Sequence, residues 1–520
     1  MPQIYNPYLP EYEYIPDGEP HVFGDRIYLY GSHDRFGGKK FCLNDYVCYS
    51  APLDDLTDWR YEGEIYNRRE DPRLSQGRHE MWAPDVVQGT DGRYYLYYCL
   101  DDKMRSVGVA VCDTPAGTYH FYGLVKDEKG GVIGEREGDT IAFDPGVFAD
   151  EDGRIYLYSG NGPRTRAAIG KEPKASVVME LCDDMLTIKT EPKKLLPMLG
   201  EAEGTGFEGH EFFEASSIRR IRGKYYLVYS SVTLHELCYA ISDRPDGDYR
   251  FGGVLVSNCD VFSDGRNRKM RNCYGNNHGG IECVNGQYYI FYHRQTNRSM
   301  FSRQGCAEKI TIEADGSIRQ VPMTSCGLNP GPLRGQGTYP AAICCNLTGA
   351  YPAAISHILA MGGRHPYITQ DREDTSPEQI ASGAPAPRQY ISNGKNGMTA
   401  VYRYFDCKGV TKISMELRGR AKGIVSVYLD AGIEENIGTE SAARTEDAAW
   451  TETAAAGESH KGKANGIRGN KAGEIRVTPA KDWTSFSGEV RIPDGVHELI
   501  FCFEGRGKME WRSFEIKTNL

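Results

Sequence analysis

The chain lacks any long hydrophobic run. No stretch approaches the roughly 18 apolar residues that a membrane-spanning helix needs, and the N-terminus MPQIYNPYLPEYEYIP has no basic region followed by an apolar core. Basic runs are missing as well, since 61 Lys and Arg stand against 71 Asp and Glu for a formal charge of −10. Nucleic acids and anionic membranes reward basic patches, so neither is an expected partner.

Paired cysteine motifs are also absent. The 15 cysteines form no CxxC pair, their number is odd, and many lie in strand-like runs, as Cys48 and Cys99 do. We expect reduced thiols and a cytoplasmic protein. The alternative is a secreted protein that has lost its signal peptide. No Cys/His cluster has zinc spacing, and the GxSxG, GxxxxGK and HExxH motifs are absent, which removes several enzyme classes.

Tyrosine, in contrast, is abundant, with 34 residues, and it marks a repeat. Five versions of one phrase occur: DRIYLYGSHD, DGRYYLYYCLD, DGRIYLYSGNG, RGKYYLVYSSV and NGQYYIFYHRQ. Their shared tyrosines are Tyr28, Tyr95, Tyr156, Tyr226 and Tyr289, at separations of 67, 61, 70 and 63 residues. Each phrase is a turn followed by an alternating strand, and each follows another short strand (EPHVF, APDVV, DPGVF, EASSI, NHGGI), so each predicts a β-hairpin.

A further strand and a polar outer segment follow the hairpins, as in VGVAVCDTPAGTY. Four short antiparallel strands per repeat, at periods above about 50 residues, are typical of propeller blades. We therefore predict an all-β chain in which residues 1–328 form a five-bladed β-propeller. The alternative is a β-sandwich with accidental similarity between its strands.

The first strands of propeller blades begin near one central channel, so their starting positions converge. Aligning the five hairpins places Glu19, Ala83, Asp144, Glu214 and Asn277 at this position. Three crowded carboxylates shift one another's pKa values and can divide into a protonated acid and an ionised base. An aspartate before proline or glycine can also simply shape a turn, but three acids at one register favour catalysis. Asp17 is the alternative to Glu19, because residues two apart on an extended strand point to the same face.

The phrases EPHVF, MWAPD, FDPGVFADEDGRIYLYSG, FFEASSIRRIRGKYYLVYSS and NNHGGI resemble glycoside hydrolase family 43. The resemblance implies an inverting enzyme that acts on arabinose- and xylose-containing plant polysaccharides. It implies Glu19 as general base, Asp144 as the residue that tunes pKa and orientation, and Glu214 as general acid. The usual first residue of this set is an Asp followed by Pro, so Glu19 departs from the pattern and Asp17 stays the alternative base.

Neighbours of these acids are candidates as well. Trp82 stands before APD at the expected mouth of the channel and is a candidate sugar-stacking platform, and Asp85 is a candidate partner of a sugar hydroxyl. The resemblance implies His278 as an axial histidine beside a candidate calcium or other cation. The alternatives are a core tryptophan, a turn-capping aspartate and a structural histidine. No cofactor is expected to be required. His293 and the arginine after it are expected to be packing or rim residues.

A Gly- and Pro-rich stretch, GLNPGPLRGQGTYPAA, ends the repeats and predicts a linker. The short alternating strands beyond it, such as GIVSVYLD and HELIFCFEG, predict a jelly-roll-like β-sandwich over residues 340–520. Their order resembles a family 6 carbohydrate-binding module. Trp450, Trp483 and Trp511 are candidate sugar platforms or, alternatively, sandwich core, which would make this domain structural rather than a binder.

Together these features predict an inverting exo-glycosidase that hydrolyses plant-cell-wall-derived oligosaccharides, as an α-L-arabinofuranosidase, a β-xylosidase or both. One alternative is a glycoside phosphorylase, which would need a basic phosphate pocket that the sequence does not reveal. The other is a non-catalytic carbohydrate-binding propeller. The sequence leaves open the sugar and its linkage, endo or exo action, and the oligomeric state.

Overall fold

The structure is a computed structural model that describes residues 2–74, 79–101, 105–355, 363–429 and 470–518. It is all-β, as predicted. Within the described ranges, its helices are the five-residue α1 (Pro377–Ala381) and the 3-10 turns η1 (Arg68–Glu70), η2 (Pro72–Leu74), η3 (Arg166–Ala168) and η4 (Ala341–Ile343). Among the residues described, none of the helices has the length and apolar character needed to cross a membrane.

Up to residue 310 the chain forms five antiparallel sheets in sequence order. The first contains β1 (Glu19–Phe23), β2 (Arg26–Tyr30), β3 (Tyr46–Pro52) and β4 (Arg60–Tyr66), and the second β5 (Met81–Gln88), β6 (Tyr94–Leu100), β7 (Gly108–Cys112) and β8 (His120–Leu124). The third contains β9 (Gly146–Ala149), β10 (Ile155–Gly160), β11 (Ser176–Leu181) and β12 (Lys193–Lys194), and the fourth β13 (Phe212–Ile221), β14 (Lys224–Ser231), β15 (Glu236–Ser242) and β16 (Arg250–Ser257). The fifth, with β17 (Ile281–Val284), β18 (Gln287–Gln295) and β19 (Arg303–Ile310), has three strands in the described part of the chain.

The first two strands of each sheet are the predicted hairpins. In the first sheet Tyr28 pairs with His21, and in the third Tyr156 pairs with Phe148. Apolar clusters fill the space between consecutive sheets: first to second, second to third, third to fourth, fourth to fifth and fifth to first. The repeated aromatic and aliphatic side chains therefore hold each sheet against its neighbours by burying apolar surface.

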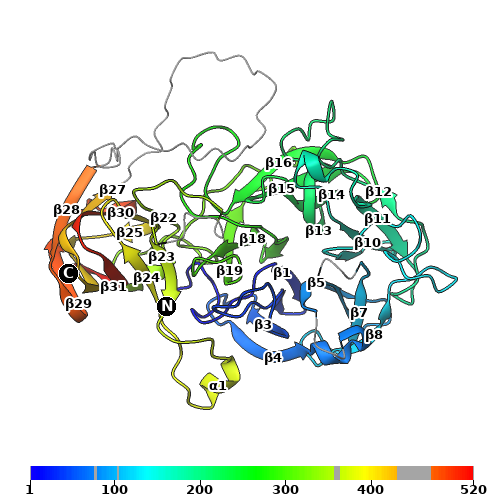
Figure 1. Cartoon of the computed structure of the whole chain (residues 1–520), viewed down its shortest axis with the longest axis horizontal. Coiled ribbons are helices and arrows are strands. Elements are labelled where there is room, and N and C mark those ends of the chain that lie inside the picture. Colours follow the sequence, from blue (N-terminus) through cyan, green and yellow to red (C-terminus); the bar gives the residue numbers. More distant parts are fainter. Residues whose placement is uncertain (1, 75–78, 102–104, 356–362, 430–469, 519–520) are drawn as a thin grey trace.

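The five sheets surround a common centre (Figure 1), and their first strands touch one another in a closed circle, with β17 returning to β1. A bridge between Gly18 and Gly279 lies at this closure. The N-terminal segment strengthens it, because the Asn6 side chain donates hydrogen bonds to the carbonyl of Ala307, at 2.9 Å, and to that of Thr324, at 3.0 Å. The start of the chain is thus fixed to its fifth sheet.

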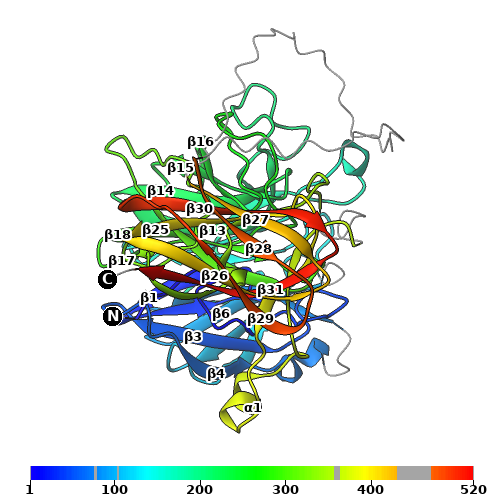
Figure 2. The ribbon, with the colours of Figure 1, turned by 90° about the vertical axis from the view of Figure 1, so that its left-hand side faces the viewer.

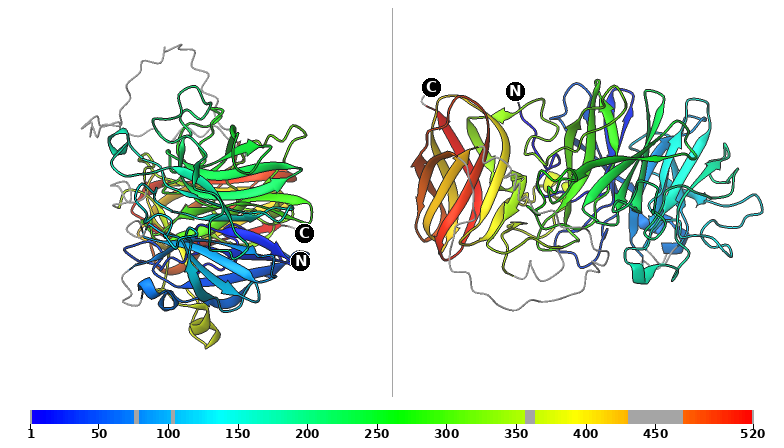
Figure 3. Two further views of the ribbon diagram at one scale, coloured as in Figure 1. Left: turned by 90° about the vertical axis from the view of Figure 1, so that its right-hand side faces the viewer. Right: turned by 90° about the horizontal axis from the view of Figure 1, so that it is seen from above.

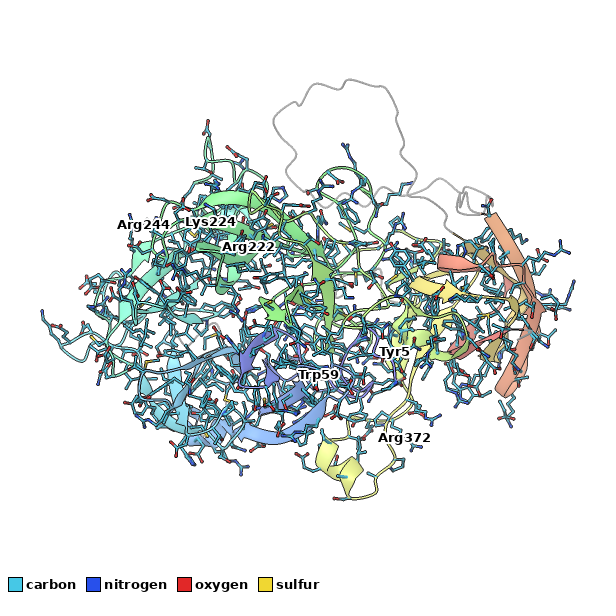
Figure 4. The ribbon with its side chains drawn as sticks, turned by 180° about the vertical axis from the view of Figure 1, so that it is seen from behind. Tyr5, Trp59, Arg222, Lys224, Arg244 and Arg372 are labelled. Atoms are coloured by element: carbon cyan, nitrogen blue, oxygen red, sulfur yellow. The ribbon has the colours of Figure 1, made fainter. Side chains whose placement is uncertain are left out.

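Two six-stranded sheets follow and pack face to face at one end of the molecule (Figures 2 and 3). One contains β20 (Leu333–Arg334), β22 (Asn346–Thr348), β25 (Thr399–Cys407), β27 (Lys422–Leu429), β28 (Asn470–Val477) and β30 (Gly495–Arg506). The other contains β21 (Gly337–Pro340), β23 (Tyr367–Gln370), β24 (Gln389–Gly394), β26 (Val410–Gly419), β29 (Ala480–Glu489) and β31 (Met509–Thr518). A single apolar core joins them, with Phe501 from one sheet and Phe514 from the other, and Tyr5 packs against it at the junction with the five sheets (Figure 4).

The candidate sugar platforms of this region have other surroundings. Trp511 is fully buried in the core between the two sheets. The Trp483 ring has the guanidinium groups of Arg418 and Arg512 at 4.4 and 4.7 Å from its centroid, and these cations occupy ring surface that a sugar would need. Trp450 lies outside the described residues.

A buried arginine connects the two parts of the chain. Arg403 of β25 donates to Asp260, which follows the fourth sheet, at 2.9 Å, and to Asn346 of β22 at 2.9 Å, and it also bonds Glu498 of β30. Only 3% of Arg403 is exposed. Because a buried charge is stable only when it is paired, this contact fixes how the C-terminal sheets sit on the fourth and fifth.

The hairpin that carries α1 provides a second connection, on the first sheet. The Asp374 carboxylate accepts a hydrogen bond from the backbone N–H of Phe36 at 3.1 Å, and Glu378 of α1 accepts one from the Tyr61 hydroxyl. Arg372, labelled in Figure 4, lies on this hairpin. The C-terminal part of the chain therefore reaches the loop between β2 and β3.

We predict that Arg403→Ala destabilises the protein by about 3–5 kcal/mol, because it leaves Asp260 and Glu498 buried without their shared cation. The free energy of unfolding in urea measures this loss. Arg244→Ala, at the end of the molecule away from the C-terminal sheets (Figure 4), is the matched control, and we expect a change of no more than about 0.5 kcal/mol. Equal stability of the two variants would contradict the assigned role of Arg403.

Candidate active site

Cross-strand pairing fixes which residues are equivalent at the start of the first strands. In the first sheet Glu19 pairs with Tyr30, and in the third Gly146 pairs with Tyr158, so these two pairs correspond. Two residues earlier stand Asp17 and Asp144. The predicted register, which aligned Glu19 with Asp144, is therefore wrong, because Glu19-Pro20 imitates the Asp144-Pro145 dipeptide two residues too late.

The same pairing also places the fourth and fifth sheets. A bulge in β13 adds one residue and sets Glu214 opposite Ser230, so Glu214 keeps its predicted place. In the fifth sheet, Ile281 pairs with Ile290, and extending this register sets His278, rather than the predicted Asn277, opposite His293. The acids brought to one register are thus Asp17, Asp144 and Glu214.

The backbone at these starting positions is left-handed. Asp17, Ala83 and Asp144 have φ of 56°, 41° and 45°, and Ala215, directly after Glu214, has φ of 71°. Residues other than glycine rarely adopt this conformation, and surrounding contacts must hold them there. For Asp17 one such contact is His293, whose Nδ1 accepts the Asp17 backbone N–H at 3.3 Å.

Asp17 faces a buried arginine. Arg303 Nη1 lies 2.9 and 3.1 Å from the two Asp17 carboxylate oxygens, and the rest of the guanidinium bonds Asp34 at 2.9 and 3.0 Å. Burial alone would raise the pKa of Asp17, but the Arg303 charge outweighs it and leaves that pKa below its usual value. Asp17 is therefore an ionised carboxylate at neutral pH.

Glu214 has the opposite character. Burial raises its pKa to about 8, and the nearby Asp17 charge adds to the rise. Its Oε2 accepts a hydrogen bond from Asn161 at 3.2 Å, and Lys174 donates to the Asn161 oxygen at 2.6 Å. Burial likewise raises the pKa of Asp144 well above its usual value, with the Glu214 carboxyl as the next cause. A proton is thus held on the Glu214 side of the site while Asp17 carries the charge.

Glu19 belongs to a second group, deeper on the same axis. Its Oε2 accepts a hydrogen bond from Ser217 at 2.9 Å and lies 3.5 Å from Arg219. Burial, followed by the Asp85 charge, raises the Glu19 pKa to about 8. His278 stands between the two groups, with Nε2 3.7 Å from Glu19 and Nδ1 3.8 Å from Asp144.

Asp85 is fully buried, and its carboxylate accepts from the backbone N–H groups of Val147 at 2.7 Å and Val86 at 2.8 Å and pairs with His21 at 2.6 Å. The prediction that Asp85 binds a sugar hydroxyl is therefore wrong, because both of its oxygens are occupied inside the protein. Its role is to join the second and third sheets to the first.

An aromatic wall borders the acids. The Trp82 ring contacts Phe41 and Phe143 at centroid distances of 5.8 and 5.6 Å, and Phe41 also contacts Phe301 at 4.7 Å. The Trp82 Nε1–H is buried and has no hydrogen-bond partner among the described residues. Trp82 is itself half-buried, so part of its ring remains open for stacking on a sugar.

Comparison with known proteins decides the family. Residues 13–318 match the family described as Glycosyl hydrolases family 43. The chain belongs to this family. It is similar to a protein named xylosidase/arabinosidase from Thermoclostridium stercorarium, with 46% identity over 99% of each chain. A second similar protein, also named xylosidase/arabinosidase, comes from Bacteroides ovatus, with 30% identity over 55% of this chain and 87% of that protein.

Among solved structures, a family 43 arabinoxylan arabinofuranohydrolase from Bacillus subtilis, in complex with cellotetraose, covers 99% of this chain and 97% of its own, at 18% identity and a TM-score of 0.47. Membership of the family makes this chain a glycoside hydrolase, and family 43 enzymes invert the configuration of the anomeric carbon.

Two groups of side chains in this family 43 enzyme could hold a metal ion, within the described residues: one is Glu19, His21 and Asp85, and the other is His210, Glu236 and Cys238. In the first group Glu19 Oε1 is buried without a hydrogen-bond partner in the described part of the chain. Burial lowers the pKa of His278, so its imidazole is neutral and could also act as a ligand. The Arg219 guanidinium, 3.5 Å from Glu19, already supplies positive charge here.

Sequence reasoning missed the residues that set the charge of Asp17. Arg303 lies in no motif, and His293, expected to be a packing or rim residue, instead contacts the Asp17 backbone. The signal that was available is the Asp34 that closes the first tyrosine phrase.

We predict that Arg303→Met moves the acid limb of the pH–kcat/KM profile to higher pH by about 1–3 pH units, because Asp17 loses the cation that keeps it ionised. Arg303→Lys, which keeps a positive charge, should shift this limb less. Arg154→Met, which removes an exposed arginine, is the control and should leave the profile unchanged. Far-ultraviolet circular dichroism checks that each variant is folded, and an unmoved acid limb in folded Arg303→Met would contradict the role given to Arg303.

Proposed function

We propose that this enzyme is an inverting exo-glycosidase that releases arabinofuranose or xylose from short plant-cell-wall-derived oligosaccharides, as an α-L-arabinofuranosidase, a β-xylosidase or both. The observation that carries the proposal is the pairing of an ionised Asp17 with a protonated Glu214 at one register of the ring of sheets. The names of the similar proteins, xylosidase/arabinosidase, support the choice of sugars.

In the proposed mechanism, Glu214 protonates the departing glycosidic oxygen and Asp17 removes a proton from the attacking water. Inverting chemistry needs these carboxyl groups about 6.5–9.5 Å apart, so that the water fits between the base and the anomeric carbon. Asp144 orients Glu214 and, by carboxyl proximity, helps keep the Glu214 proton in place. No covalent sugar–enzyme intermediate is formed.

Asp17, rather than Glu19, is proposed as the base. Asp17 shares its register and left-handed backbone with Asp144, and its charge acts on both Asp144 and Glu214. Glu19 instead bonds Ser217 and neighbours Arg219. We propose that Glu19 helps to hold the axis together and, if a calcium or other cation binds there, ligates it together with His278.

We further propose that the five sheets are the blades of a β-propeller catalytic domain over residues 1–328. Residues 340–520 would form a jelly-roll-like β-sandwich related to family 6 carbohydrate-binding modules. The closed circle of first strands supports the propeller, and the single core between the two C-terminal sheets supports the sandwich. Because Trp511 is buried and Trp483 is covered by arginines, we assign this sandwich a structural role rather than sugar binding.

Release of p-nitrophenol from the α-L-arabinofuranoside and the β-D-xyloside tests these roles. We expect Asp17→Asn to lower kcat by about 10²–10⁴-fold, the usual contribution of a general base. Glu214→Gln should lose as much on an unactivated disaccharide but less on the p-nitrophenyl glycosides, whose good leaving group needs little protonation. Glu19→Gln, the matched control, should keep kcat within about tenfold of the wild type.

The pH dependence follows from the same two groups. Because Glu214 must be protonated and its pKa is about 8, the rate should fall as the pH rises past about 8. If Glu19→Gln is inactive while Asp17→Asn remains active, Glu19 rather than Asp17 is the base. A wild type that is inert on all glycosides would contradict the proposed substrates, and activity that requires inorganic phosphate would indicate a phosphorylase.

A further inference from the structure

Side chains at the ends of second strands hold the left-handed residues of the neighbouring sheets. The backbone N–H of Ala83 donates to Ser32 Oγ at 2.7 Å, that of Asp144 to Cys99 Sγ at 3.4 Å, and that of Asp17 to His293 Nδ1 at 3.3 Å. Ser32, Cys99 and His293 each stand four residues after the tyrosine shared by the repeats. The contact recurs around the ring, but only at Cys99 is the acceptor a thiol.

Cys99 also touches the carboxyl group of Asp144. Its Sγ lies 3.8 Å from Asp144 Oδ1 and 3.6 Å from the backbone carbonyl oxygen of Trp82, both within reach of a sulfur hydrogen bond. Burial raises the pKa of the Cys99 thiol well above its usual value, so the S–H proton is retained. One proton serves one acceptor at a time, so the thiol has a choice between Asp144 and Trp82.

From these contacts we propose that Cys99 is a positioning residue for Asp144. Its sulfur accepts the Asp144 backbone N–H, and its S–H lies within reach of the Asp144 carboxyl group, so one side chain holds both the backbone and the carboxyl group of this residue. The proposal rests on the proposed function, because it assigns Asp144 a part in catalysis. It adds a residue that keeps this carboxyl group in place.

The volume of the Cys99 thiol matches the space beside Asp144. Cys99 packs in a small apolar cluster with Ile141 and Phe143, against which Trp82 also lies. A thiol fills such a cluster as a small hydrophobic group while remaining a weak donor and acceptor. A serine would keep the hydrogen bonds but fill less of the cluster, and an alanine would keep neither.

The Asp144 carboxyl group responds to several neighbours. The other titratable and charged groups that act on it or lie beside it are Glu214, Asp17, Arg303 and His278. Loss of Cys99 removes two of the contacts that keep the Asp144 backbone and carboxyl group beside these neighbours, so the position of Asp144 relative to Glu214 is less well fixed.

The test compares Cys99→Ala, Cys99→Ser and Cys48→Ala, the last a buried strand cysteine whose thiol donates to the carbonyl of Tyr49. For Cys99→Ala we expect kcat to fall about tenfold and KM to change less than about twofold, because a misplaced Asp144 affects the reaction more than binding. Cys99→Ser should recover most of kcat. Cys48→Ala should lose stability through its cavity but keep the wild-type kcat.

An infrared difference spectrum reads the thiol directly. We expect an S–H stretching band that is missing in Cys99→Ser and that is shifted in Asp144→Ala, which removes the carboxyl group. Wild-type kcat in folded Cys99→Ala, or a band that is the same in the wild type and in folded Asp144→Ala, would overturn the proposal. Wild-type turnover together with a dead Asp17→Asn reports on the proposed function separately, so failure of one proposal is distinguishable from failure of the other.

Discussion

The salt bridge between Arg303 and Asp17 is the contact on which the chemistry of this protein depends. Three carboxyl groups meet where the first strands begin, and burial would protonate all of them. Arg303, buried and anchored on its other side by Asp34, keeps one of them charged. That charge then helps to hold the proton on Glu214. A single buried cation thus divides equivalent positions of a repeat into a charged carboxylate and a protonated carboxyl group, as the proposed base and acid require.

The repeat itself is legible in the sequence. Each tyrosine phrase became the second strand of a sheet, because alternating aromatic and aliphatic residues bury both faces of a strand between neighbouring sheets. The register of the first strands, which decides which of their residues are equivalent, was harder to derive. Gly18 follows Asp17 where proline follows Asp144, and a proline two residues later made Glu19 the better match in the residue pattern. The bulge that places Glu214 opposite Ser230 likewise leaves no mark in that pattern.

The partners of the acids could not be derived from the sequence for a different reason. Arg303 lies 286 positions from Asp17, and no local periodicity connects them. His293 and Cys99 looked like ordinary strand residues, and their contacts exist only because neighbouring sheets are packed side by side. Asp85 looked available to a ligand, yet it is buried against His21 and Val147. The sequence revealed which residue types stand near the acids, but which of these residues contact one another depends on closure of the ring of sheets.

That closure has a consequence for how the chain is made. The hydrogen bond from Asn6 to Ala307 spans 301 positions, and the first strand touches the fifth sheet. On a ribosome, the first sheet emerges long before the segment that covers its open side. Contacts of such high sequence separation form slowly and leave apolar strands exposed in the meantime. Asp17, the proposed base, therefore acquires its arginine only after the fifth sheet has been made, so the charge of this site depends on closure of the ring rather than on the first sheet alone.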